Sequence, residues 1–154
     1  MTSLDRIDRH MLTILQQNGR ISTAELAETV GLSASPCARR LKRLEDEGYI
    51  DGYHATINKA KAGITMKFFV EISLSRHQVD SIQEFEHAVM DMEEVINCHI
   101  VSGGYDYLLE VVSRDLESYE LFTRQLHRLE NIKDIHTHLS IRQINDRSVV
   151  PVYA

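Results

Sequence analysis

The sequence predicts an α+β fold in two parts, because its hydrophobic pattern changes period along the 154 residues. Apolar residues of the first third recur at steps of three and four, as an amphipathic helix requires. Farther along, segments that alternate apolar and polar residues, as strands do, are interleaved with further helical stripes. We therefore expect a (winged) helix-turn-helix in residues 1–50, a strand and linker in residues 51–63, and a ferredoxin-like βαββαβ domain in residues 64–154.

The first two helices are marked by their apolar stripes and by their ends. Asn18-Gly19, a pair that favours a turn, closes the first stripe, which consists of Leu4, Ile7, Met11, Ile14 and Leu15. Ser22-Thr23-Ala24-Glu25 has the spacing of a capping box, in which Ser22 accepts from the Glu25 amide while Glu25 reaches back. We expect a second, short helix from this box to Val30.

A third helix is expected from Ser33 to about Glu47. Gly31 allows a tight or left-handed backbone before it, and Gly48 ends it. Ser33-Ala34-Ser35-Pro36 offers a hydroxyl cap and a proline in the first turn. Two helices joined by a short turn that contains glycine form a helix-turn-helix, although a helical hairpin in an all-α enzyme has the same spacing.

Charge is distributed unevenly along the chain, whose formal net charge is -6. Residues 1–60 hold eight Lys or Arg and eight Asp or Glu, so the acidic excess lies entirely in residues 61–154. Residues 33–44 contain four cationic side chains and no acidic one. Such a cluster suits contact with phosphate groups, and the alternative is a solvated helix face.

The third helix turns its apolar and its cationic residues to opposite sides. At 100° per residue, Cys37, Leu41 and Leu44 point inward together. On the other arc we expect Arg39 to read base edges, and Lys42 and Arg43 to contact the phosphate backbone. Arg40 lies on the flank, where it reaches either a phosphate or an acid such as Glu47. The candidate DNA-binding residues are Ser33, Ser35, Pro36, Ala38, Arg39, Arg40, Lys42 and Arg43.

Residues after Gly48 change from helices to strands. Residues 49–57 have the pattern of a short strand and linker. Four longer strands are expected, the first alternating Phe68, Val70, Ile72 and Leu74 with polar residues, and the others over Val95–Ser102, Tyr105–Val112 and Asp134–Ile144. Two helices lie between them, with apolar stripes of Val79, Ile82, Phe85, Val89 and Met92, and of Leu116, Tyr119, Phe122, Leu126 and Leu129.

One face of the predicted sheet has no helix to cover it. Phe69 lies on that face between Lys67 and Glu71, and the last strand contributes His136, His138, Ser140 and Arg142 to the semi-polar side. An uncovered sheet with apolar patches usually pairs with a partner sheet, so we expect a symmetric homodimer. A dimer also suits a helix-turn-helix, which commonly reads two half-sites about one duplex turn (~34 Å) apart.

Short motifs along nearly the whole chain resemble the leucine-responsive regulatory protein and asparagine-regulator (Lrp/AsnC, or feast/famine) family of prokaryotic transcription regulators. In the first half they are Leu4-Asp5-Arg6-Ile7-Asp8-Arg9, Asn18-Gly19-Arg20-Ile21-Ser22, Val30-Gly31-Leu32-Ser33, Pro36-Cys37, Arg43-Leu44-Glu45, Gly48-Tyr49-Ile50 and Gly52-Tyr53. In the second half they are Val70-Glu71-Ile72-Ser73-Leu74 and the run from Cys98 to Leu109. This many motifs in order make a chance match improbable.

The resemblance implies a cytoplasmic, nucleoid-associated transcription regulator. It implies binding to pseudo-palindromic promoter sites in double-stranded DNA as a homodimer, often assembled into an octamer of four dimers. The second domain is then ACT-like (a RAM domain), and assembly or DNA binding responds to leucine or another amino acid. Ala34 and Ser35 stand where close relatives often carry Pro and Thr, and Ala38-Arg39 also differs, so the operator sequence is not transferable.

The resemblance also implies an effector site at a glycine turn. Its candidates are Ser102, Gly103, Gly104, Tyr105 and Asp106, with Thr137 contributed from a neighbouring subunit. The glycines let backbone groups approach a ligand, and Asp106 is suited to accept from an α-ammonium group. Gly104 stands where relatives often have an acid. The alternative is a plain hairpin turn that Asp106 caps.

Several other classes of protein find little support. No apolar run approaches the ~18 residues that cross a bilayer, and the first ten residues lack a secretory signal, so we expect a cytoplasmic protein without membrane contact. Cys37 and Cys98 suit neither a disulfide framework nor a metal site, and both are expected to be buried thiols. His136 and His138 could bind a metal only across subunits, because His99 lies on the opposite edge strand.

No catalytic constellation is visible, so we expect no enzyme and no cofactor other than the amino-acid effector. There is no nucleophile elbow, no paired carboxylates and no phosphate-cradling glycine loop. The remaining alternative is a sensor subunit that binds an amino acid and regulates a partner enzyme without contacting DNA. That alternative leaves the cationic third helix unexplained.

Overall fold

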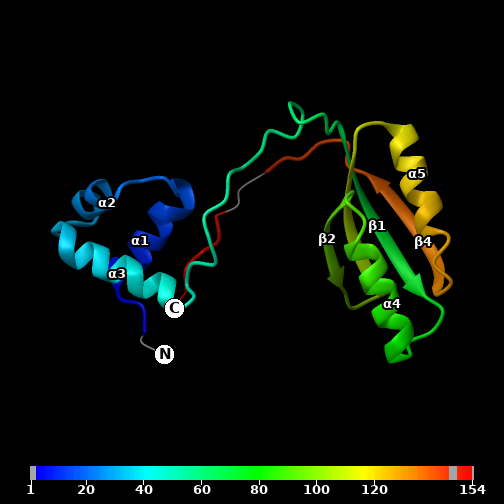
Figure 1. Ribbon diagram of the computed structural model, residues 1–154, viewed down its shortest axis with the longest axis horizontal. Helices are drawn as coiled ribbons and strands as arrows, with labels where there is room; N and C mark the ends of the chain where they lie inside the picture. Colours follow the sequence, from blue (N-terminus) through cyan, green and yellow to red (C-terminus); the bar gives the residue numbers. More distant parts are fainter. Residues whose placement is uncertain (1–2, 146–148, 154) are drawn as a thin grey trace. The chain divides into compact units, whose positions relative to one another are not determined.

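The computed structural model describes residues 3–145 and 149–153, which form two compact units. We call residues 3–56 with 145 and 149–153 the helical unit, and residues 57–144 the sheet unit. The helical unit contains α1 (Arg6–Gln17), α2 (Thr23–Val30) and α3 (Ala34–Asp46) (Figure 1). These are the three helices that the sequence predicts.

Side chains and glycine set the ends of these helices. Ser22 and Glu25 form the predicted capping box at α2, and Gly31 ends that helix in the left-handed region at φ 72°. Asp5 and Asp8 form a second capping box at α1, which sequence analysis missed. The predicted hydroxyl cap of α3 is wrong, because Ser33 makes no side-chain cap bond. An N-cap hydroxyl normally accepts from the second or third helical amide, and here the third helical residue is Pro36, which has no N–H.

The core of the helical unit lies where the three helices meet. Cys37 is fully buried there, as expected, and packs in a cluster with Leu4, Met11, Leu12, Leu15, Leu26, Ala27 and Leu44. The short strand expected within residues 49–57 is wrong, since this fully described segment contains no strand. Tyr49 and Ile50 pack against the helical cluster instead, and the Tyr53 hydroxyl donates to Glu45 at 3.0 Å. These contacts hold the segment without a partner strand.

The sheet unit has the predicted βαββαβ order. Its elements are β1 (Met66–Leu74), α4 (Val79–Met90), β2 (Val95–Ile100), β3 (Tyr107–Ser113), α5 (Leu116–Leu126) and β4 (Ile132–Leu139). The strands are antiparallel in the order β2-β3-β1-β4, so β2 and β4 are the two edges. Both helices cover one face, because Phe85 and Val89 of α4 share a core with Phe122 and Leu126 of α5 (Figure 1).

Exposure differs from the sequence expectation at several edges of the sheet unit. Cys98 is exposed rather than buried, because β2 is an edge strand with no neighbour on one side. Val79 and Leu116 begin their helices and are also exposed, so the apolar stripes start one turn later than predicted. The last strand ends at Leu139, five residues earlier than expected.

The open face of the sheet is held by polar pairs around an apolar centre. Lys67 contacts Glu110 at 3.0 Å, and Asn97 donates to the same carboxylate at 2.7 Å. His138 lies 3.3 Å from Glu71, and Lys67 also lies 5.3 Å from the centre of the Phe69 ring. Within the described ranges, no group of three His, Cys, Asp or Glu side chains could hold a metal ion. None of the helices found in those ranges is long and apolar enough to span a bilayer.

Candidate nucleic-acid interface and ligand-binding turn

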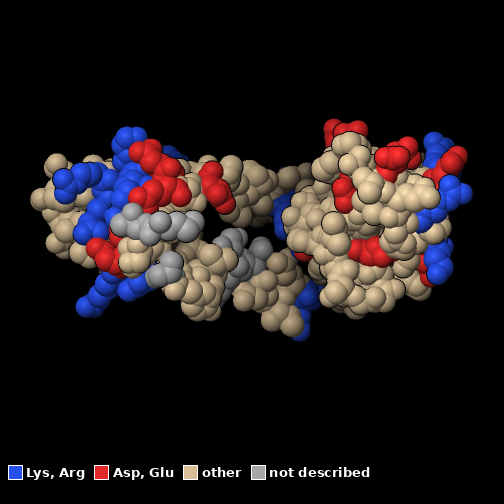
Figure 2. Space-filling model, turned by 90° about the horizontal axis from the view of Figure 1, so that it is seen from below, with Lys and Arg blue, Asp and Glu red and all other residues tan. Residues whose placement is uncertain are grey.

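The solvent-facing side of α3 carries most of the residues predicted to meet DNA. Ser33, Ser35, Ala38 and Arg39 are exposed, and Pro36 is half-buried beside them. No ion pair holds Arg39 among the residues that the structure describes. Figure 2 shows Lys and Arg side chains gathered on the helical unit, with acidic side chains directly beside them. This side of α3 therefore presents small residues and one unpaired guanidinium group to solvent.

Lys42 lies on the same side, one turn after Arg39. Its ammonium group contacts Asp46 at 3.0 Å, and both side chains are largely exposed. Exposed pairs of this kind contribute little, about 0.3–0.5 kcal/mol on a helix. A phosphate can therefore replace Asp46 as the partner of Lys42 at small cost.

Arg40 and Arg43 are bound to a buried carboxylate. Asp8 of α1 is only 1% exposed and lies 2.9 Å from Arg40 Nη1 and 2.6 Å from Arg43 Nη2. Arg40 also contacts Asp5 at 2.6 Å, and these carboxylates raise the Arg40 pKa. Arg40 thus pairs with acids, one of the two alternatives considered from sequence, although the acids are Asp5 and Asp8. Four charged side chains join the start of α1 to the middle of α3 and fix how the two helices pack.

This network reduces the cationic surface that α3 offers to solvent. Arg43 is two-thirds buried, and its Nε atom has no hydrogen-bond partner in the described part of the chain. Arg39 and Lys42 remain as the accessible cations of the predicted set. Sequence reasoning missed Asp5 and Asp8 as partners, although two aspartates three residues apart at the head of an apolar stripe already have capping-box spacing.

The network should make the stability of the helical unit depend on acid pH. The Asp8 amide donates to Asp5 at 2.8 Å and, with Arg40, lowers the Asp5 pKa from 3.8 to about 2. Because the folded pKa is depressed, the ionised carboxylate stabilises the folded unit above about pH 4, and this contribution disappears as pH falls towards 2. In thermal melts from pH 6 to pH 2.5, the melting temperatures of wild type and Asp5→Asn should become equal at the acid end of this range. Curves that stay parallel, as expected for the exposed control Glu28→Gln, would contradict this role.

The predicted effector residues lie in one turn between β2 and β3. Ser102, Gly103 and Gly104 are exposed, and Gly103 has a φ of 134°, a conformation that favours glycine. Asp106 follows the turn and accepts from the Leu74 amide at 2.7 Å. That bond, with His77 at 3.1 Å, lowers the Asp106 pKa. The carboxylate is therefore ionised at neutral pH, anchors the end of β1, and remains one-third exposed.

Thr137 lies on another part of the sheet within one chain. It pairs with Val70 across β1 and β4, on the face that the helices cover, and its hydroxyl lies 2.7 Å from that of Tyr119. The other five predicted residues are consecutive in the turn. Within one chain Thr137 is thus separate from the turn, and its contribution from a neighbouring subunit stays a prediction.

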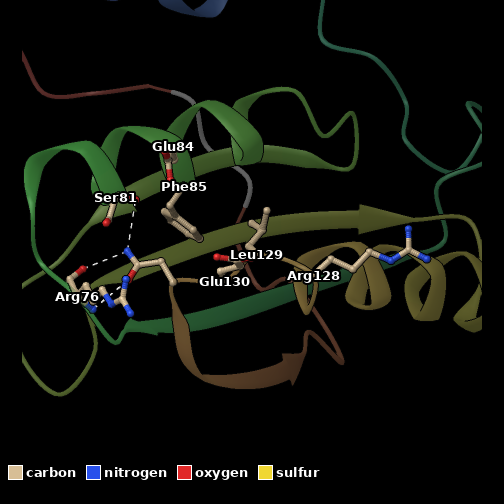
Figure 3. A pocket seen from close by; sticks show the side chains of 8 residues that line it. Arg76, Ser81, Glu84, Phe85, Arg128, Leu129 and Glu130 are labelled. Atoms are coloured by element: carbon tan, nitrogen blue, oxygen red, sulfur yellow. Dashed lines mark hydrogen bonds between the residues drawn. The ribbon is translucent and has the colours of Figure 1, made fainter.

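A cavity of about 330 Å³ lies beside the loop that contacts Asp106. Phe85 and Leu129 face each other across it, while Arg128 extends away (Figure 3). The Asn131 side chain closes one end by donating to the backbone oxygens of Arg76 and Ser81. The predicted effector residues do not line this cavity. Arg76, on its wall, is the neighbour of His77, so the cavity and the turn share one short loop.

Comparison with known protein families gives two matches, one to each half of the chain, and the second continues past residue 144, where the sheet unit ends. Residues 4–51 match the winged helix-turn-helix DNA-binding model, and residues 67–150 match the Lrp/AsnC ligand-binding domain model. The leucine-responsive regulatory protein of Escherichia coli K12 is 42% identical over 142 residues, which cover 92% of this chain and 87% of that relative. The protein of the same name from Klebsiella pneumoniae is equally similar over the same shares.

Solved structures agree with the fold over nearly the full length. A transcriptional regulator from Neisseria meningitidis, solved in complex with L-Met, is 32% identical with a TM-score of 0.93 and covers 97% of each chain. An AsnC family transcriptional regulator from Agrobacterium tumefaciens is also 32% identical, with a TM-score of 0.92 over 96% of this chain and 97% of that one.

Proposed function

The chain belongs to the Lrp/AsnC family of DNA-binding transcription regulators with an amino-acid ligand-binding domain, and on this premise we propose how its own residues perform that work. The helical unit binds pseudo-palindromic promoter sites in a sequence-specific way. The sheet unit binds an amino acid and changes assembly or DNA binding in response. The site of action is then the cytoplasm, where promoter DNA lies. The observation that carries the proposal is the exposed side of α3, with Arg39 unpaired and Lys42 weakly paired.

In this proposal α3 enters the major groove with its first two turns. Arg39 pairs with a guanine edge, and Lys42 contacts a phosphate after releasing Asp46. Ser33, Ser35, Pro36 and Ala38 lie closest to the bases, where small side chains allow close approach. No acidic residue stands in the first turn of α3, and no side chain caps its amides, so the helix start also suits a phosphate. Arg40 and Arg43 set the angle of α3 through Asp8.

Ser102 to Asp106 form the core of the proposed effector site. The exposed glycine backbone leaves room for a ligand carboxylate and side chain, and the ionised Asp106 accepts from the α-ammonium group. Thr137 of a second subunit completes the site. Leucine and methionine are the first candidates, because relatives are named for leucine responsiveness and one similar structure contains L-Met.

A homodimer through the open sheet face, and an octamer of four dimers, complete the proposal. The face carries Phe69, Leu108 and Val112 among the charged pairs, and antiparallel sheets with one bare face commonly pair with a second copy. Two copies supply the two recognition helices that a pseudo-palindromic site needs. A sensor subunit that controls an enzyme without contacting DNA would not need the exposed cationic side of α3.

Alanine at Arg39 and Lys42 tests the proposal. Each neutralised phosphate contributes a slope of about −0.9 to the dependence of log affinity on log salt, so removal of the Lys42 contact should make the slope shallower by about one per subunit. Loss of a bidentate guanine contact costs about 1–3 kcal/mol, which is roughly a 5- to 150-fold loss of affinity for the selected duplex. Duplex selection from upstream DNA, followed by titrations at ~50 and ~200 mM salt with and without L-leucine or L-methionine, measures both.

Glu45→Ala and Glu47→Ala, which also lie on or just after α3, serve as matched controls and should keep the salt slope. Unchanged duplex affinity in the Arg39 and Lys42 variant would contradict the recognition role of α3. Selective DNA binding that stays unchanged with both L-leucine and L-methionine would contradict their role as effectors.

A further inference from the structure

An apolar groove runs along α1 and the segment that follows α3. It lies inside the helical unit, away from the exposed side of α3, and encloses a cavity of about 550 Å³. Its walls are uncharged except for Asp51. They are formed by Leu4, Leu12, Leu15, Gln16, Tyr49, Ile50, Gly52 and Tyr53.

Residues 150–153 form a further wall of the same cavity. One side chain satisfies both backbone groups of Val150, because Gln16 donates to its carbonyl oxygen at 3.1 Å and accepts from its amide at 2.7 Å. Val152 is partly buried against the helical cluster, whereas Tyr153 is 89% exposed. The segment Val-Val-Pro-Val carries no charge, which matches the apolar groove. Terminal residues are usually loose unless they are tied down in this way.

This contact gives the chain two connections between its units. The chain leaves the helical unit near Thr56, forms the whole sheet unit, and returns to the helical unit at Asn145. The returning segment follows directly from β4, the edge strand that carries Thr137. We propose that residues 149–153 act as a strap, which fastens the chain shortly after the end of the sheet unit to the α1 groove and so limits how freely the two units can turn relative to each other.

A restraint of this kind has a consequence for DNA recognition. A module on a single flexible linker adapts to many spacings of its partner site, while a second short connection removes much of that freedom. With the strap in place, two recognition helices of a dimer match one half-site spacing. The inference rests on the proposed function for this consequence, but the restraint itself can be measured without DNA.

Two substitutions should release the strap. Gln16→Ala removes both hydrogen bonds to Val150, and Val152→Asp places a charge in the apolar groove. Matched controls are available on neighbouring exposed residues, namely Gln17→Ala at the same helix end and Tyr153→Asp at the same end of the chain. Melting curves identify any variant that fails to fold, and Gln16→Ala is the milder of the two.

The first measurement uses spin labels on the full-length protein. The exposed native Cys98 labels the sheet unit, a Thr29→Cys substitution labels the exposed side of α2, and excess unlabelled protein suppresses distances between copies. We expect the distribution of distances between the labels to become about twofold broader in both strap variants and to stay unchanged in both controls. An unchanged width in the strap variants overturns the strap.

The second measurement uses a selected duplex and the same duplex with five base pairs inserted between its half-sites. The insertion turns one half-site by about half a turn, so we expect wild type to lose roughly 30-fold or more in affinity and the strap variants roughly 3-fold. Equal losses in wild type and the strap variants overturn the strap. If no form binds any duplex, the proposed regulation fails, and the spin-label distances alone decide the strap.

Discussion

Replacing Asp8 by alanine should destabilise the helical unit by about 3–5 kcal/mol, because removing one member of a buried ion pair leaves its partners without compensation. Arg40 and Arg43 would lose their common carboxylate, and the Asp5 amide would lose its acceptor in the capping box. Both guanidinium groups retain some exposure and can recover part of their hydration, which favours the lower end of this range. Domains are stable by only about 5–15 kcal/mol, so the loss is a large part of the total.

Differential scanning calorimetry measures this effect directly. For a unit of this size, a loss of about 3 kcal/mol lowers the melting temperature by roughly 12–24 °C. Asp46→Ala is the matched control, since it removes the exposed carboxylate that pairs with Lys42 on the same helix, and should cost less than about 1 kcal/mol. If the Asp8 and Asp46 variants melt together, the buried network does not hold α1 to α3.

The Asp8 network also marks the point where sequence reasoning about the site stopped. Period and spacing predict α3 and its exposed side, because these depend on residues within a few turns of each other. In the sequence, Arg43 has the same expected role as Lys42, and Arg40 differs only by its position on the flank of the helix. In the structure, Arg40 and Arg43 differ from the other two cations of residues 33–44 because α1 brings Asp8 next to them from 32 and 35 positions away. Such a contact depends on tertiary packing, to which a local charge count is blind.

The sheet unit shows the same division between local and distant causes. The alternation of apolar and polar residues predicts which face of β1 is buried. Phe68, Val70, Ile72 and Leu74 are all buried, as predicted. Alternation does not reveal that β2 is an edge strand, so the exposure of Cys98 was missed. The prediction of a strand after α3 was wrong for a related reason. A strand needs a partner strand, and the apolar residues of this segment pack against the helices instead. The groove that holds Val150 and Val152 likewise joins residues far apart in the chain.

Replacing Phe122 by alanine should destabilise the sheet unit by about 3–5 kcal/mol, the usual cost of removing a buried aromatic ring from a core. The ring is fully buried between α5 and the sheet, and its centre lies 5.9 Å from that of Tyr119. Tyr119 in turn stacks on Phe68 at 3.6 Å and contacts the Thr137 hydroxyl. A cavity at Phe122 therefore loosens the support under a proposed effector residue. Leu121→Ala, on the exposed side of the same helix, should cost far less.

The Phe122 and Asp8 variants together test whether the two units perform separate tasks. Because Phe122 lies in the core of the sheet unit and Asp8 is buried in the helical unit, calorimetry should show a different transition shifted in each variant. At temperatures where both remain folded, the Phe122 variant should lose heat of binding with L-leucine or L-methionine, whichever binds wild type, and keep the salt slope on DNA. The Asp8 variant should keep the heat of binding with the amino acid and lose the salt-dependent binding to DNA. If both variants instead lose both activities in parallel, recognition and sensing share one cooperative structure, and the division of roles between α3 and the β2–β3 turn is wrong.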